Sequence, residues 1–314
     1  MKSIIFMSAS ALLISVSAIA ADNATRSNLN DSGTASDVQY NAKVQSSFGK
    51  FMKNSHFNEG EANVYVLTPS IGADIGNWET RLEYPITTFS PEQEKDLKKT
   101  TLYGRPGVSG YNKFETESGS TVKAGALVRL PFAELDSEDK DTSEDADFYR
   151  AWQLRPEVKA VTPISDTSIR VISETGVSIE SIHRERNKYK SGKSTYEYEL
   201  PPVWLAKLGA ETGDRYAFGA AVNSLYGFGK TNVKYKGRFE GNSYHGNDEY
   251  PALEYIGLEL YNRSQVSKDL EVYVGIKKSL RDQNGDYSPG YVGQLDDYNS
   301  VSSLSTNLAI QAQF

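Results

Sequence analysis

The chain has 314 residues, and its composition excludes several classes of protein. Without Cys it can form no disulfide framework, no cysteine-ligated zinc site and no iron–sulfur cluster. No internal run approaches the roughly 18 apolar residues of a membrane-spanning helix, and a net charge of −7 argues against nucleic-acid binding. The 20 Tyr, 12 Phe and 3 Trp are many for so polar a chain, and they need a surface suited to an apolar ring with a polar tip.

The first 20 residues have the pattern of a secretory signal peptide. Lys2 gives a positive start, residues 4–19 are mostly apolar, and Ala18-Ile19-Ala20 places small residues where a signal peptidase cleaves. A membrane anchor is the less favoured interpretation, because Ser residues dilute the apolar stretch. Residues 21–36 are polar and aperiodic, so we expect a disordered periplasmic tail there, with residues 37–314 as a single domain.

From residue 37 onward the hydropathy repeats every two residues, which is the period of a β-strand with two different faces. Five short polar turns separate pairs of alternating segments, at residues 75–77, 117–120, 165–167, 212–214 and 267–269. Each predicts a hairpin. Longer connections rich in charge and Gly lie near residues 53–60, 89–100, 137–147, 184–195, 229–248 and 282–300. Short turns at one end and long loops at the other are typical of an outer-membrane barrel, with the turns in the periplasm.

A proline recurs in each hairpin as a weak internal repeat, at Pro69, Pro106, Pro156, Pro202 and Pro251. We place these prolines near the extracellular strand ends, because Pro cannot donate to the ladder. Five hairpins, a first strand at 38–52 and a last at 301–314 make twelve strands. Fourteen are possible if residues 229–248 or 282–300 hold a further hairpin. The predicted fold is all-β, a transmembrane antiparallel up-and-down β-barrel. A soluble β-sandwich is the alternative, but its loops would not divide into a short and a long set.

The last strand carries a signal for assembly. Its alternate apolar residues end in an aromatic residue, a pattern that the barrel-assembly machinery reads; they include Ile310, Ala312 and Phe314. We therefore expect export through the periplasm and insertion into the outer membrane of a Gram-negative bacterium, as a monomer in contact with outer-membrane lipids and lipopolysaccharide. The basic tip at 184–193 could pair with lipopolysaccharide phosphates. Lys234, Lys236 and Arg238 alternate with apolar residues, so one strand pair could project above the membrane.

The strand face opposite to the lipid carries charges of both signs, in near balance, which predicts weak ion selectivity. The pore-lining candidates are Arg81, Glu83, Lys113, Lys123, Arg129, Lys159, Arg170, Glu174, Lys207, Glu271 and Lys277. Further charges expected on this face are Glu79, Glu115, Arg155, Glu157, Glu180 and Glu259. Side chains fill eight-stranded barrels, whereas twelve strands make a wider ring. Gly219, Gly257 and Gly275 add no bulk on the strands. A water-filled lumen is therefore favoured over a closed one in which the charges pair.

These features resemble the monomeric outer-membrane porins of the OmpG type. Residues 68–82 and the stretch from Arg105-Pro106 onward are the most similar local segments. The resemblance implies a single-chain channel for mono- and oligosaccharides, and that family has fourteen strands. Twelve strands would suit the KdgM-type porins for acidic oligosaccharides, whose lumens carry ladders of basic residues. The matching acidic set in this chain departs from that pattern.

The predicted function is passive diffusion of small hydrophilic solutes through a porin, with no catalytic residue, cofactor or metal. An outer-membrane barrel enzyme of lipase or protease type and a pore-less adhesin or structural barrel are the alternatives. A barrel lipase needs His two residues before Ser, but here Ser181 precedes His183 and Ser243 precedes His245. The acidic stretches at 136–147 and 282–286 lack the Gly and Glu spacing of a calcium loop.

Overall fold

The computed structural model describes most of the chain from Val38 to Phe314. The described residues are 38–51, 62–91, 100–131, 134–137, 145–149, 152–180, 183–189, 192–250, 252, 254–283 and 304–314. The predicted signal peptide (1–20) and tail (21–36) lie outside these ranges, as do most of the connections predicted at 53–60, 89–100, 137–147 and 282–300. Every regular element in the described part is a β-strand. None of the described segments is a helix long and apolar enough to cross a membrane.

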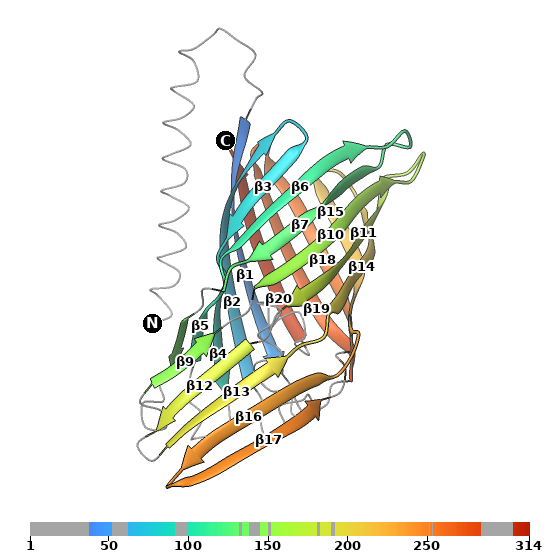
Figure 1. The fold of residues 1–314 in the computed structure, drawn as a ribbon. Coiled ribbons are helices and arrows are strands. Elements are labelled where there is room, and N and C mark those ends of the chain that lie inside the picture. The colour runs from blue at the N-terminus through green and yellow to red at the C-terminus, as the bar shows by residue number, and fades with distance from the viewer. Residues whose placement is uncertain are drawn as a thin grey trace, which may run out of the picture.

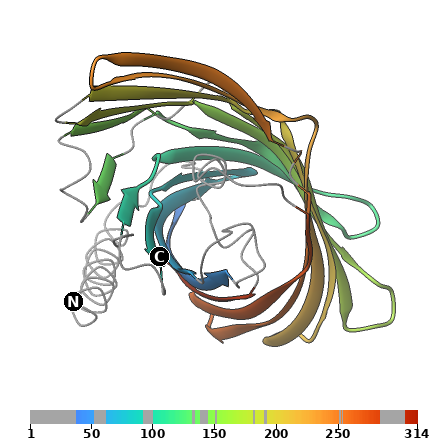
Figure 2. The ribbon, with the colours of Figure 1, turned by 90° about the horizontal axis from the view of Figure 1, so that it is seen from below.

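Twelve antiparallel strands close into a barrel (Figures 1 and 2). In order around the wall they are β1 (Val38–Phe51), β2 (Ala62–Ile75), β3 (Trp78–Glu83), β6 (Gly107–Glu115), β7 (Thr121–Arg129), β10 (Gln153–Pro163), β11 (Ile169–Glu180), β14 (Val203–Thr212), β15 (Tyr216–Gly227), β18 (Glu254–Ser267), β19 (Leu270–Gln283) and β20 (Leu304–Gln313). The ring closes where β20 pairs with β1. The predicted up-and-down barrel of twelve strands is confirmed.

The five predicted short turns all join neighbouring barrel strands at the same end of the barrel. Gly76, Gly119 and Gly213 have positive φ in three of them, at 57°, 77° and 97°, a conformation that favours Gly over any residue with a Cβ. We refer to this end, which is drawn at the top of Figure 1, as the turn end. We refer to the opposite end, which is drawn at the bottom of Figure 1, as the upper end. Pro106 and Pro202 directly precede β6 and β14 at their upper ends, and Pro156 is the fourth residue of β10, near its upper end, as expected.

Pro69 does not follow this pattern. It lies in the middle of β2, where its carbonyl accepts a hydrogen bond from the Tyr84 amide just after β3 ends. β2 passes this point without a break, whereas its partner changes from β3 to β4 (Ile86–Pro91). The expectation for Pro69 was therefore wrong, because the long β2 serves both the barrel and the wall above it. Pro251 lies outside the described residues.

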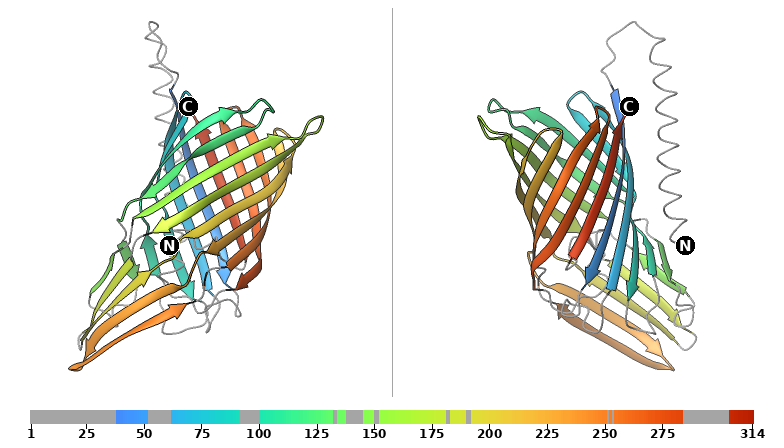
Figure 3. Two further views of the ribbon diagram at one scale, coloured as in Figure 1. Left: turned by 45° about the vertical axis from the view of Figure 1, so that its right-hand side comes forward. Right: turned by 180° about the vertical axis from the view of Figure 1, so that it is seen from behind.

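Beyond the upper end, part of the barrel continues as a curved wall (Figures 1 and 3). β4, β5 (Thr100–Tyr103) and β8 (Glu134–Ser137) extend the barrel sheet beside β2. A second sheet has the order β17-β16-β13-β12-β9, and its strands are β9 (Asp145–Tyr149), β12 (His183–Tyr189), β13 (Gly192–Glu199), β16 (Thr231–Phe239) and β17 (Asn242–Tyr250). The connections predicted as loops at 184–195 and 229–248 thus contain strand pairs. Neither pair enters the barrel ring, and β19 pairs directly with β20, so no hairpin from 229–248 or 282–300 adds to the ring and the fourteen-strand alternative was wrong. The projecting pair predicted from Lys234, Lys236 and Arg238 is β16–β17.

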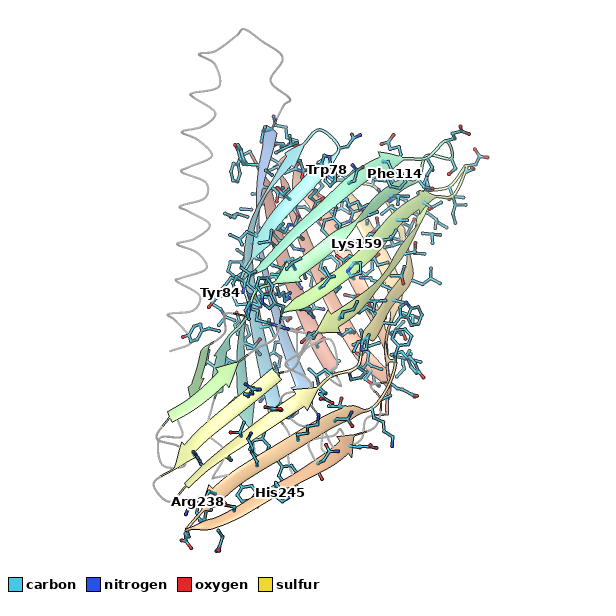
Figure 4. The ribbon with its side chains drawn as sticks, viewed as in Figure 1. Trp78, Tyr84, Phe114, Lys159, Arg238 and His245 are labelled. Carbon is cyan, nitrogen blue, oxygen red and sulfur yellow. The ribbon has the colours of Figure 1, made fainter. Side chains whose placement is uncertain are left out.

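An apolar belt covers the outside of the barrel. It includes Leu82, Val108, Leu208, Val222, Leu260, Ile276 and Leu308, all exposed on outward positions. Aromatic side chains flank the belt at the turn end, among them Trp78, Phe114, Tyr216 and Phe218, and at the upper end, among them Tyr84, Trp152, Trp204 and Tyr226 (Figure 4). Phe218 and Tyr226 are eight residues apart on β15, about 26 Å of strand, or a height of about 19 Å at a tilt of about 45°. Both rings therefore lie near the borders of an apolar band about 25 Å tall.

Candidate functional site: the barrel lumen

A cavity of about 470 Å³ lies inside the barrel, and every barrel strand except β6 contributes a side chain to its wall. Its charged lining residues are Lys43, Glu83, Arg129, Arg155, Glu174, Lys207, Glu259, Glu271 and Lys277. Most of the others are polar and include Gln45, Thr68, Asn223, Tyr273, Asn307 and Gln311. Five basic and four acidic residues therefore share one polar cavity, in the near balance that the sequence predicts.

Six of the eleven predicted pore-lining residues lie on this cavity: Glu83, Arg129, Glu174, Lys207, Glu271 and Lys277. The other five have inward positions closer to the turn end, where each pairs with a carboxylate; they are Arg81, Lys113, Lys123, Lys159 and Arg170. The alternating sequence pattern thus identified which side chains face inward. Whether an inward side chain borders the cavity depends on its height along the barrel axis. The passage of solute past any of these residues stays a prediction.

An ion cluster on the inner wall near the turn end surrounds Glu79 of β3. The Lys123 ammonium lies 2.8 Å from its carboxylate, with Arg81 at 3.2 Å and Lys113 at 3.4 Å. Lys113 also contacts Asp74 at 2.8 Å. Three cations from β3, β6 and β7 thus meet two carboxylates from β2 and β3, so this stretch of wall is held together by charge.

A second cluster lies across the barrel around Glu211 of β14, whose side chain is 2% exposed. Arg263 approaches it at 2.5 Å and Arg170 at 3.0 Å, while the Tyr261 hydroxyl donates to it at 3.3 Å. Arg263 also reaches Glu271 at 3.1 Å. Glu211 and Arg263 are not among the lumen charges predicted from the sequence. Each is an even number of residues from a predicted inward charge on the same strand, Glu211 from Lys207 and Arg263 from Glu259, and this spacing could have identified both as inward-facing.

Tyrosine rings occupy part of the lumen. Tyr261 and Tyr273 stack with their centroids 5.3 Å apart, and the Tyr273 hydroxyl donates to Glu259 at 2.5 Å. Tyr261 lies directly between Gly219 of β15 and Gly275 of β19 in the register. A Cβ on Gly219 would lie only 2.2 Å from the Tyr261 ring. The strand glycines that suggested a roomier lumen therefore make space for rings.

Two cavity charges differ from the rest because neither has a direct ion-pair or hydrogen-bond partner among the described side chains. Among the described residues, Lys43 and Glu174 are the charged cavity residues that form no ion pair, side-chain hydrogen bond or ring contact. Lys43 is on β1 and Glu174 on β11, which are six strands apart in either direction around the ring. A lone cation and a lone anion thus lie on opposite walls of the same cavity.

The predicted assembly signal lies at the closure of the barrel. Ile310 and Ala312 pair with Val44 and Ala42 of β1, and the Phe314 backbone exchanges two hydrogen bonds with Tyr40. Recognition by the assembly machinery stays a prediction.

The arrangement is similar to that of known outer-membrane channels. A channel from Pseudomonas putida F1 has a TM-score of 0.57 and 10% sequence identity, over 91% of this chain and 100% of that one. A mutant of the monoaromatic hydrocarbon channel TodX has a TM-score of 0.52 and 8% identity, over 89% of this chain and 90% of that one. A KdgM porin solved with disordered oligogalacturonate has a TM-score of 0.38 and 8% identity, over 88% of this chain and 98% of that one. No protein-family model and no curated protein sequence matches the chain. The first two likenesses show the barrel fold, and the OmpG-type assignment stays a prediction.

Proposed function

We propose that this protein is a passive channel of the Gram-negative outer membrane for small hydrophilic solutes. The observation that carries the proposal is the polar cavity to which eleven of the twelve barrel strands contribute. Because β20 pairs with β1 of the same chain, one chain builds the complete wall, which supports a monomeric channel. The apolar belt outside and the ionic lumen inside suit a protein that separates water from hydrocarbon.

Mono- and oligosaccharides are the solutes that we propose. The cavity wall combines amide and hydroxyl groups with one aromatic ring, that of Tyr273, and most of its charges are already neutralised by neighbours. Uncharged polyols can exchange hydrogen bonds with such a wall without the cost of displacing an ion. The same polar lining argues against hydrocarbon cargo of the kind named for TodX.

Single-channel recording of the refolded barrel in a planar bilayer tests the channel. Discrete conductance steps are expected, together with swelling of proteoliposomes in sugars whose rate falls as the sugar grows from mono- to oligosaccharide. A folded barrel that gives neither current nor swelling would support the pore-less alternative. Hydrolysis of lipid or peptide by the same preparation would support the enzyme alternative.

A further inference from the structure

The outward face of β15 is apolar, and past residues 228–230 the chain continues as β16, whose outward face is basic. Even-numbered residues lie outside along both strands, and odd-numbered Leu225, Thr231 and Val233 are buried. The outward series begins with the exposed rings of Tyr226 and Phe228 and continues with the exposed ammonium of Lys230. Lys234, Lys236 and Arg238 follow, all exposed. The outward face that meets lipid along β15 is therefore followed, along β16, by a cationic face beyond the membrane.

The basic residues nearest the membrane are neutralised within the protein. Lys230 lies 2.8 Å from Glu249, and Lys234 lies 2.5 Å from Glu199. The hydrogen bond and the charge of each carboxylate raise the pKa of its lysine, which favours the charged lysine in each pair. These lysines have partners and leave little charge for a ligand.

Farther from the membrane, the basic residues lie opposite other basic residues of the neighbouring strands. Arg238 lies directly opposite Lys193 of β13, and Lys236 lies directly opposite His245 of β17. In the part of the chain that the structure describes, no carboxylate lies within ion-pair distance of Lys193, Lys236 or Arg238. Like charges at opposed positions of neighbouring strands destabilise a sheet unless something else neutralises them. Figure 4 shows Arg238 and His245 on the projecting sheet, beyond the barrel.

The position of this cluster indicates its ligand. Lys236 is eight residues beyond Phe228 of the aromatic girdle, about 26 Å of strand, or a height of about 19 Å at a barrel-like tilt of about 45°. The cluster continues the lipid-facing surface, so a solute on its way to the lumen would pass along the other face of the sheet. An anionic group held among the surrounding lipids would meet it directly.

We propose that Lys193, Lys236 and Arg238 bind phosphate groups on the saccharide core of lipopolysaccharide. Arg and Lys side chains pair with phosphate through charge-assisted hydrogen bonds, and three of them on adjoining strand positions can hold one phosphorylated sugar region. The contact would steady the projecting sheet against the surface of the outer leaflet.

Titration of the full-length barrel, in detergent, with fluorescent phosphorylated lipopolysaccharide tests this proposal. The double variant Lys236→Gln/Arg238→Gln should bind about tenfold more weakly than the parent, from two lost charge contacts. It should also show a shallower dependence of affinity on salt. Arg215→Gln/Lys268→Gln, which removes two exposed cations at the turn end, is the matched control and should bind like the parent.

Further measurements identify the source of the phosphate and verify that the protein is folded. Dephosphorylated lipopolysaccharide should bind the parent and the double variant equally. Unchanged affinity of the double variant for phosphorylated lipopolysaccharide, or an equal loss in the control, would overturn the proposal. So would a loss confined to a soluble acidic oligosaccharide such as polygalacturonate, or to phosphatidylglycerol vesicles. Unaltered heat-modifiable gel mobility and unaltered conductance verify that the barrel and its proposed channel are intact.

Discussion

Arg105 and Glu180 form a two-point ion pair whose side chains are 0% and 2% exposed. Nη1 of Arg105 donates to Oε2 at 3.3 Å, and Nη2 donates to Oε1 at 3.2 Å. Arg105 precedes β6 and Glu180 ends β11, with β7 and β10 between them in the sheet. Gln153 of β10 donates to the same carboxylate at 2.7 Å. The pair thus spans the upper rim, where the barrel passes into the projecting wall.

Replacing Arg105 with Ala should lower the free energy of unfolding by about 3–5 kcal/mol, because it removes the Arg105 cation from a buried ion pair with Glu180. Urea titration of the barrel folded in lipid vesicles measures this loss. The control is Arg184→Ala, which removes an ion pair with Glu197 whose side chains are 43% and 28% exposed; it should cost less than about 1 kcal/mol. Equal losses would show that burial of Arg105 adds nothing.

Neutralising the two lone charges of the cavity should shift ion selectivity in opposite directions. Lys43→Gln should favour cations and Glu174→Gln should favour anions. A unit charge about 8 Å from the ion path in an aqueous lumen is worth roughly 0.5 kcal/mol, or about a twofold change in permeability ratio. Reversal potentials in a dilute KCl gradient report the change. Arg129 and Arg170 are poorer probes because their replacement would also remove an ion-pair partner from Glu83 and from Glu211.

The selectivity experiment has a control outside the lumen. Lys268→Gln, in the β18–β19 turn, should leave the reversal potential unchanged at moderate salt because its 90% exposed side chain is screened. Shifts of the same sign for Lys43→Gln and Glu174→Gln would contradict their placement on opposite walls of one conducting path.

The packing of Tyr261 on Gly219 predicts a stability difference between two glycines. Gly219→Ala would place a Cβ 2.2 Å from the ring and should cost about 1–3 kcal/mol. Gly110→Ala is the matched control, because a Cβ there meets nothing within 4 Å; it should be neutral or slightly stabilising. Thermal or urea unfolding of the two variants side by side measures the difference. Equal stability would mean that the Tyr261 ring moves aside at no cost.

Sequence alternation sufficed to predict the barrel, because each residue must face either lipid or lumen. On β20 it placed Leu308 on the lipid face and Ala309, which is 7% exposed, on the lumen face. The five short turns fixed which strands pair as hairpins. The alternation did not predict the partners of the lumen charges. Glu211 and Arg263 are 52 residues apart and meet only because β15 lies between their strands.

The remaining errors have similar physical causes. A Tyr near a strand end, such as Tyr261, fits an aromatic girdle at the membrane surface, but the inward parity of Tyr261 buries it over two glycines. The strands at 183–199 escaped prediction because, above the membrane, neither face of a sheet must be apolar. Without that constraint the period of two in residues such as Arg184 to Lys193 carries little hydrophobic signal.

A lysine scan of the outer belt should reveal where the barrel sits in the bilayer. Leu208 is 63% exposed in the middle of the belt, and Phe228 is 61% exposed at its upper border. Leu208→Lys should cost about 2–4 kcal/mol in lipid vesicles, whereas Phe228→Lys should cost about 0–1 kcal/mol, because the price of a charge falls toward the interface. The cost at Leu208 should also shrink in detergent micelles, which let water and the long side chain reach one another. Equal costs at the two positions in vesicles would show that Leu208 does not lie in the hydrocarbon layer, and this would contradict the assignment of the belt.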